Sequence, residues 1–352
     1  MKLMRMNTSI TKTNRVGWLD NCKGFAIILV VIGHILSGYI GKNYFANHMP
    51  EMHYIYEFIY SFHMPLFFIL SGYVFQMAYS IDIAQNKMRF KIQIMNNIYV
   101  YILWSCVQWA IKMLFDSDVN IKFTCDDLLL MPVKPMGIYW YIYVLILYYL
   151  LFYFWGKINL KDKYKLIITA LISILGSFIS VDFDFVFPLR RFLIYIFFFY
   201  LGMYVSKFPK TKIISGAAFA VYLSGSVISA VLIYVFDTRT LNAGAVGIIS
   251  AMCLSMFVIY LFEKISFLKN AKVFNLFGIY SLEIYVTHNF ITAANRIILL
   301  KLGITNFYFN LILNFIMAVF IPVICSFVLK KVKLHKAVFR PFSYLSDKKY
   351  SR

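Results

Sequence analysis

Charged residues, and acidic ones above all, are scarce in this chain of 352 residues. Only 14% of its positions are charged, and 15 Asp and Glu stand against 35 Lys and Arg. A soluble domain of this length carries more polar surface, so the composition excludes an ordinary soluble enzyme. A mean hydropathy of +0.73 and a hydrophobic content of 61% are instead typical of a polytopic membrane protein.

Several motifs of soluble enzymes are absent as well. The sequence contains no glycine-rich phosphate loop, no carboxylate pair at glycosidase spacing and no HExxH-type metal motif. Its five cysteines are scattered without a pairing or zinc-binding pattern: Cys22, Cys106, Cys125, Cys253 and Cys325. We therefore expect neither a disulfide framework nor a bound metal.

Long apolar stretches fill most of the chain, and roughly 20 apolar residues span a bilayer as a helix. They predict ten transmembrane helices, over residues 24–40, 57–79, 98–115, 138–155, 164–181, 190–206, 213–236, 244–262, 274–298 and 307–329. No cleavage site follows the first apolar run, so we expect an uncleaved first span. The chain should form one all-α membrane domain over residues 1–352, with a basic N-terminus (1–20) and a basic tail (330–352).

The net charge of +20 is explained by the orientation of the chain in the membrane, and the basic residues do not cluster into a nucleic-acid-binding patch. Most Lys and Arg lie in the N-terminal segment, the even-numbered connections and the C-terminal tail, whereas the other connections are acidic by comparison. The positive-inside rule then places both termini in the cytosol. We expect membrane lipids, and no nucleic acid, among the partners, with the tail near anionic headgroups.

The first apolar run carries Lys23 and His34, and ionisable residues inside a membrane helix indicate a functional site by default. Eleven positions at about 100° each return to nearly the same helix face, with a rise of roughly 16 Å. One face thus holds a cation at the membrane edge and an imidazole near the midplane. This layout suits an acyl-coenzyme A whose phosphates stay at the surface. Asp20 can pair with Lys23 across one turn, either to anchor the helix or to position Lys23 for phosphate.

His34 has two possible roles. It could form a hydrogen bond between helices inside the bundle, or it could act as a general base toward an attacking hydroxyl. A neutral imidazole in an apolar site can accept a proton near neutral pH. A covalent acyl-imidazole intermediate is a variant of the second role.

Four segments resemble the membrane acyltransferase family 3, and within it the fucose 4-O-acetylase-like branch of surface-polysaccharide O-acetyltransferases. They are residues 15–34, 61–72, 190–202 and 278–288. The resemblance implies ten transmembrane helices in a bacterial inner (plasma) membrane. It also implies transfer of an acyl group, usually acetyl, from cytosolic acyl-coenzyme A to a sugar hydroxyl of a cell-envelope glycan, a surface polysaccharide or its lipid-linked precursor.

In this family a basic residue and a histidine of the first span act together with arginines near the third. Lys23 and His34 match the first pair. The third-span pattern differs, because Lys87, Arg89 and Lys91 stand where the family often has Arg-x-x-Arg. Which of these basic residues takes the arginine role is left open. A basic cluster there serves topology and could also clamp the donor phosphates.

Further candidates lie in the second and ninth spans. His63 should lie at a depth similar to that of His34, and it precedes Pro65 inside its helix. It either satisfies the carbonyl that the proline frees or contacts the acceptor. Glu283 and His288 either bind the acceptor or tie their helix into the bundle.

Arg190 and Arg191 lie on the outer side, against the positive-inside rule. They either pair with the nearby Asp182 and Asp184 or grip an anionic or hydroxylated acceptor, and we favour the acceptor.

We interpret the chain as an O-acyltransferase with acetyl-coenzyme A as donor and no metal. His34 is the predicted catalytic residue; Lys23, Asp20, Lys87, Arg89 and Lys91 would bind the donor, and His63, Arg190, Arg191, Glu283 and His288 the acceptor. The rival is a transporter or flippase of lipid-linked sugars, in which buried polar residues line a path. The lack of a repeat and of paired broken spans speaks against it. A structural subunit would leave the Lys23–His34 face unexplained.

Overall fold

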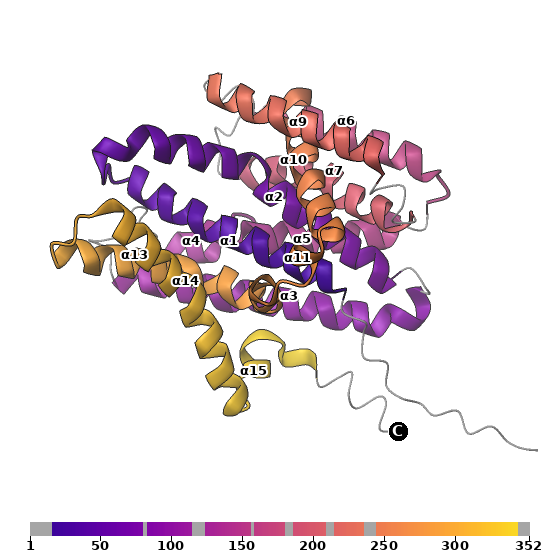
Figure 1. Cartoon of the computed structure of the whole chain (residues 1–352). Coiled ribbons are helices and arrows are strands. Elements are labelled where there is room, and N and C mark those ends of the chain that lie inside the picture. Colours follow the sequence, from indigo (N-terminus) through magenta and orange to yellow (C-terminus); the bar gives the residue numbers. More distant parts are fainter. Residues whose placement is uncertain are drawn as a thin grey trace, which may run out of the picture.

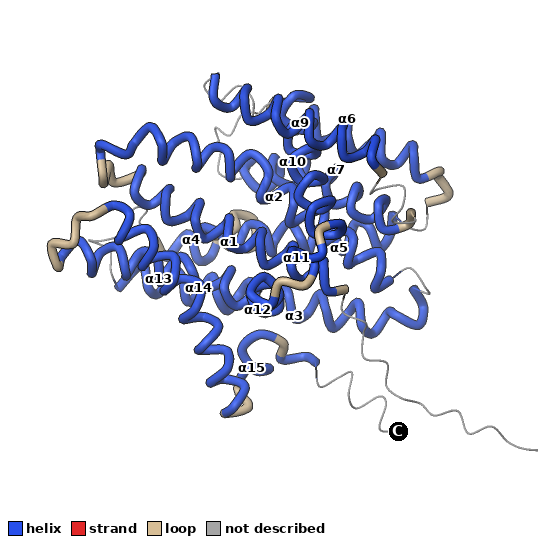
Figure 2. Tube along the Cα trace, in the orientation of Figure 1, coloured by secondary structure: helices blue, strands red, loops and turns tan. Residues whose placement is uncertain are grey.

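A computed structural model of the chain describes residues 16–79, 83–114, 124–155, 158–179, 186–208, 215–235 and 244–343. These residues are helical with short loops, and none of them forms a strand (Figure 2). The long helices are α1 (Gly17–Ile40), α2 (Met49–Tyr79), α3 (Ile83–Leu114), α5 (Trp140–Trp155), α6 (Asp162–Ser177), α7 (Val186–Ser206), α9 (Gly216–Val235), α10 (Gly244–Lys264), α13 (Ser281–Lys301) and α14 (Phe307–Lys331). Short helices are η1 (Ala46–His48), α4 (Cys125–Leu129), η2 (Gly137–Tyr139), α11 (Ser266–Lys269), α12 (Lys272–Ile279), α15 (His335–Phe339) and η3 (Pro341–Ser343).

Within the described ranges, seven helices are long and apolar enough to cross a membrane: α1, α2, α5, α7, α9, α10 and α14. The other three predicted spans coincide with α3, α6 and α13. Of these, α6 has only 16 residues, and α3 and α13 carry many polar side chains. An all-helical membrane protein is therefore confirmed, whereas the count of ten spans and the cytosolic termini stay predictions.

Three helices, α1, α2 and α3, begin well before the residue that hydropathy predicts. α1 starts at Gly17, so Lys23 and His34 lie on one continuous helix. α2 starts at Met49, so His63 lies well inside its helix and not near its start. α3 starts at Ile83, well before residue 98. Helical hydrogen bonding continues through polar residues at a membrane edge, where an apolar window ends.

α1 and α2 run side by side at the centre of the bundle (Figure 1). α7 and α10 pack against α2, while α12 and α13 pack against α1. A second tier covers these contacts: α6 on α7, α9 on α10 and α14 on α13. α3 pairs with α5, which also touches α7. The centre of the bundle is thus built from the two helices that carry His34 and His63.

Glycines bring α2 and α7 to backbone distance. A Cβ on Gly72 would overlap the carbonyl of Phe199, and a Cβ on Gly202 would overlap the carbonyl of Ile69. Small residues permit this close approach between membrane helices. The contact fixes the helix that carries His63 against the helix that carries the two arginines.

The predicted ninth span is not one helix but two. α12 ends and α13 begins around Tyr280, whose φ of −101° and ψ of 18° leave the helical region. Lys330 of α14 donates a hydrogen bond of 2.8 Å to the Tyr280 hydroxyl. On the α12 side, a Cβ on Gly278 would overlap the carbonyl of Asp20 in α1. The break lets α12 pack closely on the start of α1 while α13 continues along it.

Candidate active site

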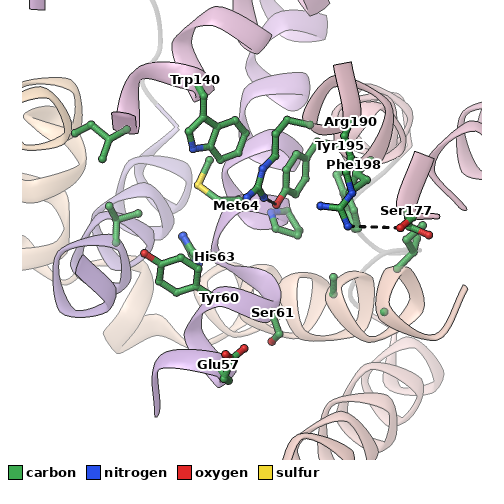
Figure 3. A pocket seen from close by; sticks show the side chains of 18 of the residues that line it. Glu57, Tyr60, Ser61, His63, Met64, Trp140, Ser177, Arg190, Tyr195 and Phe198 are labelled. Atoms are coloured by element: carbon green, nitrogen blue, oxygen red, sulfur yellow. Dashed lines mark hydrogen bonds between the residues drawn. The ribbon is translucent and has the colours of Figure 1, made fainter. Parts of the chain in front are cut away.

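A cavity of about 320 Å³ opens between α1, α2, α7 and α10, toward the end of the bundle at which α7 and α10 begin. Four of the predicted site residues line it: His34, His63, Arg190 and Arg191. We call it the His34 cavity. Figure 3 shows Arg190, Tyr195 and Trp140 on one wall and Glu57, Tyr60 and Ser61 on another.

Three histidines from three helices lie close together, and two of them, His34 and His63, line this cavity. The ring centres of His34 and His288 are 5.0 Å apart. Tyr60 lies between His34 and His63, with ring-centre distances of 6.2 Å and 4.7 Å. His288 is fully buried and does not itself line the cavity, so it supports His34 from behind.

Backbone carbonyls fix the tautomers of two of these histidines. The Nδ1 of His63 donates to Ile59 O at 2.7 Å, and the Nδ1 of His288 donates to Tyr285 O at 2.8 Å. Because a carbonyl only accepts, Nδ1 carries the hydrogen in each ring and Nε2 is left as the acceptor. The Nε2 of His288 is buried without a partner among the described residues. Both rings are therefore held in one orientation, each with its Nε2 as a hydrogen-bond acceptor.

The hydrogen bond of His63 to Ile59 O also tests the prediction that His63 satisfies the carbonyl left free by Pro65. Pro65 removes the N–H that would pair with the carbonyl of Ser61, four residues earlier. His63 bonds Ile59 O instead, so it does not fill the gap that the proline leaves.

Arg191 is held by aromatic side chains. Its guanidinium lies 4.9 Å from the ring centre of Trp140 and 5.0 Å from that of Phe187, and it donates to the Tyr195 hydroxyl at 3.1 Å. Stacking of this kind orients a planar cation without neutralising it. Arg191 therefore keeps its positive charge at the cavity wall.

Arg190 donates to the main-chain oxygen of Ser177 at 3.5 Å (dashed in Figure 3). The Nε of each arginine is buried without a hydrogen-bond partner, and no carboxylate in the described ranges forms an ion pair with either. Asp182 and Asp184 lie outside the described residues, so the predicted pairing with them stays untested.

A second cavity, of about 220 Å³, lies between α1, α2, α3, α5 and α13, on the side at which α1 begins. Its polar lining includes Lys23, Gln93 and Asn97, and the rest is largely apolar. We call it the Lys23 cavity. Lys23 and Asp20 pair at 3.9 Å, which confirms the pairing that the sequence predicted.

The two cavities share a wall. Val30, Met64 and Tyr285 line both of them. Tyr285 is held in place because its hydroxyl donates to Ile138 O, while Tyr139 donates in return to Val286 O at 2.9 Å. The two cavities are therefore neighbours along α1, one at Lys23 and one at His34, and these three side chains line both.

Several predicted residues lie outside these two cavities. Lys87, Arg89 and Lys91 are exposed on the first turns of α3, and none of them lines either cavity. Glu283 accepts a hydrogen bond of 2.8 Å from His335 in α15, also outside both cavities. The structure thus separates these four residues from the histidine cluster.

Sequence reasoning missed Glu57, Tyr60, Trp140 and Tyr285, which all line the His34 cavity. Glu57 is the first residue of the predicted second span (57–79), so the sequence places it at the membrane edge. Because α2 begins at Met49, Glu57 lies about two turns inside a helix that is long and apolar enough to cross a membrane, and a carboxylate in such a helix is a signal that could have found it. The aromatic residues carry no signal in a chain with 19% aromatics.

Comparison with known proteins identifies the family to which the chain belongs. Residues 16–331 match the family model described as an acyltransferase domain. Nodulation protein NolL of Mesorhizobium japonicum is 28% identical over 145 residues, which are 39% of this chain and 35% of NolL. The chain therefore spans about a third of the length of that relative. No solved structure matches the chain significantly.

Proposed function

The chain belongs to this acyltransferase family, and from that premise we propose that it moves an acetyl group from coenzyme A to a sugar hydroxyl. The acceptor is a cell-envelope or surface polysaccharide or its lipid-linked precursor, and the membrane is the bacterial inner membrane. The observation that carries the proposal is the pair of cavities on one face of α1, with Lys23 in one and His34 in the other.

The donor enters the Lys23 cavity. The ammonium of Lys23 binds a phosphate as a point charge, and the amides of Gln93 and Asn97 offer hydrogen bonds to the polar arm of coenzyme A. The exposed Lys87, Arg89 and Lys91 attract the anionic donor from a distance without entering the cavity. The apolar remainder of the cavity takes the thioester end.

His34 carries out the chemistry. It makes no hydrogen bond within the described part of the chain, so a ring nitrogen is free to take the proton of the sugar hydroxyl. The hydroxyl oxygen bonds to the thioester carbonyl carbon, the carbon–sulfur bond breaks, and the departing thiolate takes the proton from His34. His288, 5.0 Å away and fixed by backbone carbonyls, orients the His34 ring.

The acceptor occupies the His34 cavity from the side at which α7 begins. The guanidiniums of Arg190 and Arg191 hold sugar hydroxyls or an anionic group of a lipid-linked precursor. Tyr60 and Trp140 offer aromatic faces to the sugar ring. Donor and acceptor thus reach His34 from opposite ends of the bundle.

The test is release of free thiol from acetyl-coenzyme A by the purified protein supplied with candidate glycans. His34→Ala should lose roughly 10²-fold or more of the acyl transfer. His48→Ala removes a histidine that stacks on Phe307 outside both cavities, and it should keep the activity. Substantial activity in well-folded His34→Ala contradicts the role of His34. Glycan translocation without thiol release contradicts the transferase and favours a flippase.

A further inference from the structure

The side chains that separate the two cavities are well placed to control what crosses between them. Val30, Met64 and Tyr285 are 2%, 8% and 7% exposed, so they form a packed partition. We infer that this partition selects the acyl group by its length, with Val30 and Met64 as the residues that set the limit. The inference rests on the proposed function and adds the acyl specificity of the same site.

The order of residues along α1 requires passage of this partition. Val30 lies seven positions after Lys23 and four before His34. Seven and four positions are about two turns and one turn of a helix, so the three side chains follow one face at rises of roughly 10 Å and 6 Å. A thioester that enters beside Lys23 must therefore bring its carbonyl past Val30 to reach His34.

The three side chains of the partition differ in how readily they can change conformation. Tyr285 is fixed because its hydroxyl bonds Ile138 O and its neighbour Val286 accepts from Tyr139. Val30 is branched and stiff in a helix. Met64 is unbranched and changes rotamer readily. The width of the passage is therefore set by a fixed tyrosine ring and a stiff valine, and only the methionine moves aside.

Such a passage should admit the methyl of an acetyl group and obstruct longer chains. One additional methylene in a tight apolar site changes specificity by roughly 10- to 200-fold. Removing side-chain atoms from Val30 or Met64 should relax this limit without touching the residues that bind phosphate or sugar.

The experiment compares acetyl-, propionyl- and butyryl-coenzyme A as donors with one acceptor. Val30→Ala and Met64→Ala should each raise the propionyl-to-acetyl ratio of kcat/KM by roughly 10-fold or more. Val30→Ile, which adds a methylene, should lower that ratio. The ratio is independent of how much protein is folded, so partial loss of stability does not obscure the result.

Matched controls lie on the same helices. Val31→Ala and Met52→Ala make the same truncations at positions that are fully buried but line neither cavity. Their ratios should equal that of the wild type. An active wild type whose ratio is unchanged by Val30→Ala and Met64→Ala, or changed equally by the controls, overturns the inference alone. A wild type that consumes no acyl-coenzyme A overturns the proposed function and the inference with it.

Discussion

Replacing Gly72 or Gly202 by alanine should separate α2 from α7. In each case the new Cβ would overlap a carbonyl of the other helix, Phe199 O or Ile69 O. A backbone oxygen cannot rotate away as the end of a long side chain can, so the helices themselves must move. Overpacking of this kind destabilises a protein by about 1–3 kcal/mol. The better helix propensity of alanine offsets only about 0.5–1 kcal/mol of that loss.

Activity should fall together with stability, because α2 carries His63 and α7 carries Arg190 and Arg191 on opposing walls of one cavity. The assay is the thermal unfolding midpoint in detergent, followed by acyl transfer at a temperature where every variant is folded. Gly216→Ala is the control, since no atom lies within 4 Å of its added Cβ. If Gly72→Ala unfolds at the same temperature as Gly216→Ala, the close packing of α2 on α7 is wrong.

Two further substitutions separate acceptor contacts from structural ones. Arg191→Ala should raise the acceptor KM by roughly 10- to 100-fold, since hydrogen bonds to charged groups contribute about 1.5–3 kcal/mol. Arg191→Lys should restore only part of the acceptor affinity, because lysine lacks the planar group that stacks on Trp140. Steady-state kinetics with each substrate varied in turn measures both KM values, and an effect on the donor KM alone would contradict the acceptor role. Glu283→Gln should leave both KM values within about twofold of the wild type and lower the unfolding midpoint slightly, because Glu283 is hydrogen-bonded to His335. A large rise in the acceptor KM would instead show that Glu283 contacts the acceptor.

The all-helical class and the position of Lys23 and His34 on one helix could be predicted from the sequence. Both depend on local physics: apolar runs long enough to cross a bilayer, the cost of ionisable residues within them, and the period of the α-helix. Pairing of Asp20 with Lys23 follows from the same period. These features need no knowledge of which helices are neighbours.

Neighbour relations could not be predicted in this way. Arg89 lies one turn before Gln93 on nearly the same face of α3, yet Gln93 and Asn97 line the Lys23 cavity and Arg89 does not. How far the cavity extends along α3 decides this, and a cluster of like charges does not indicate it. The break at Tyr280 depends on contacts with α1 and α14. The shared wall at Tyr285 depends on a hydrogen bond to Ile138, 147 positions earlier in the chain. Each is decided by tertiary packing.

The division of labour along α1 is the central claim, and the kinetics of Lys23→Ala test it most directly. Loss of one charge-assisted phosphate contact should raise the KM for acetyl-coenzyme A by roughly 10-fold or more and leave the KM for the glycan nearly unchanged. Lys23→Arg should recover part of the loss. His34→Ala should mainly lower kcat. Lys207→Ala, which breaks the ion pair with Asp162 outside both cavities, serves as the control for lost charge. If Lys23→Ala leaves the donor KM unchanged and weakens only the acceptor, the passage of the thioester from Lys23 to His34 is wrong.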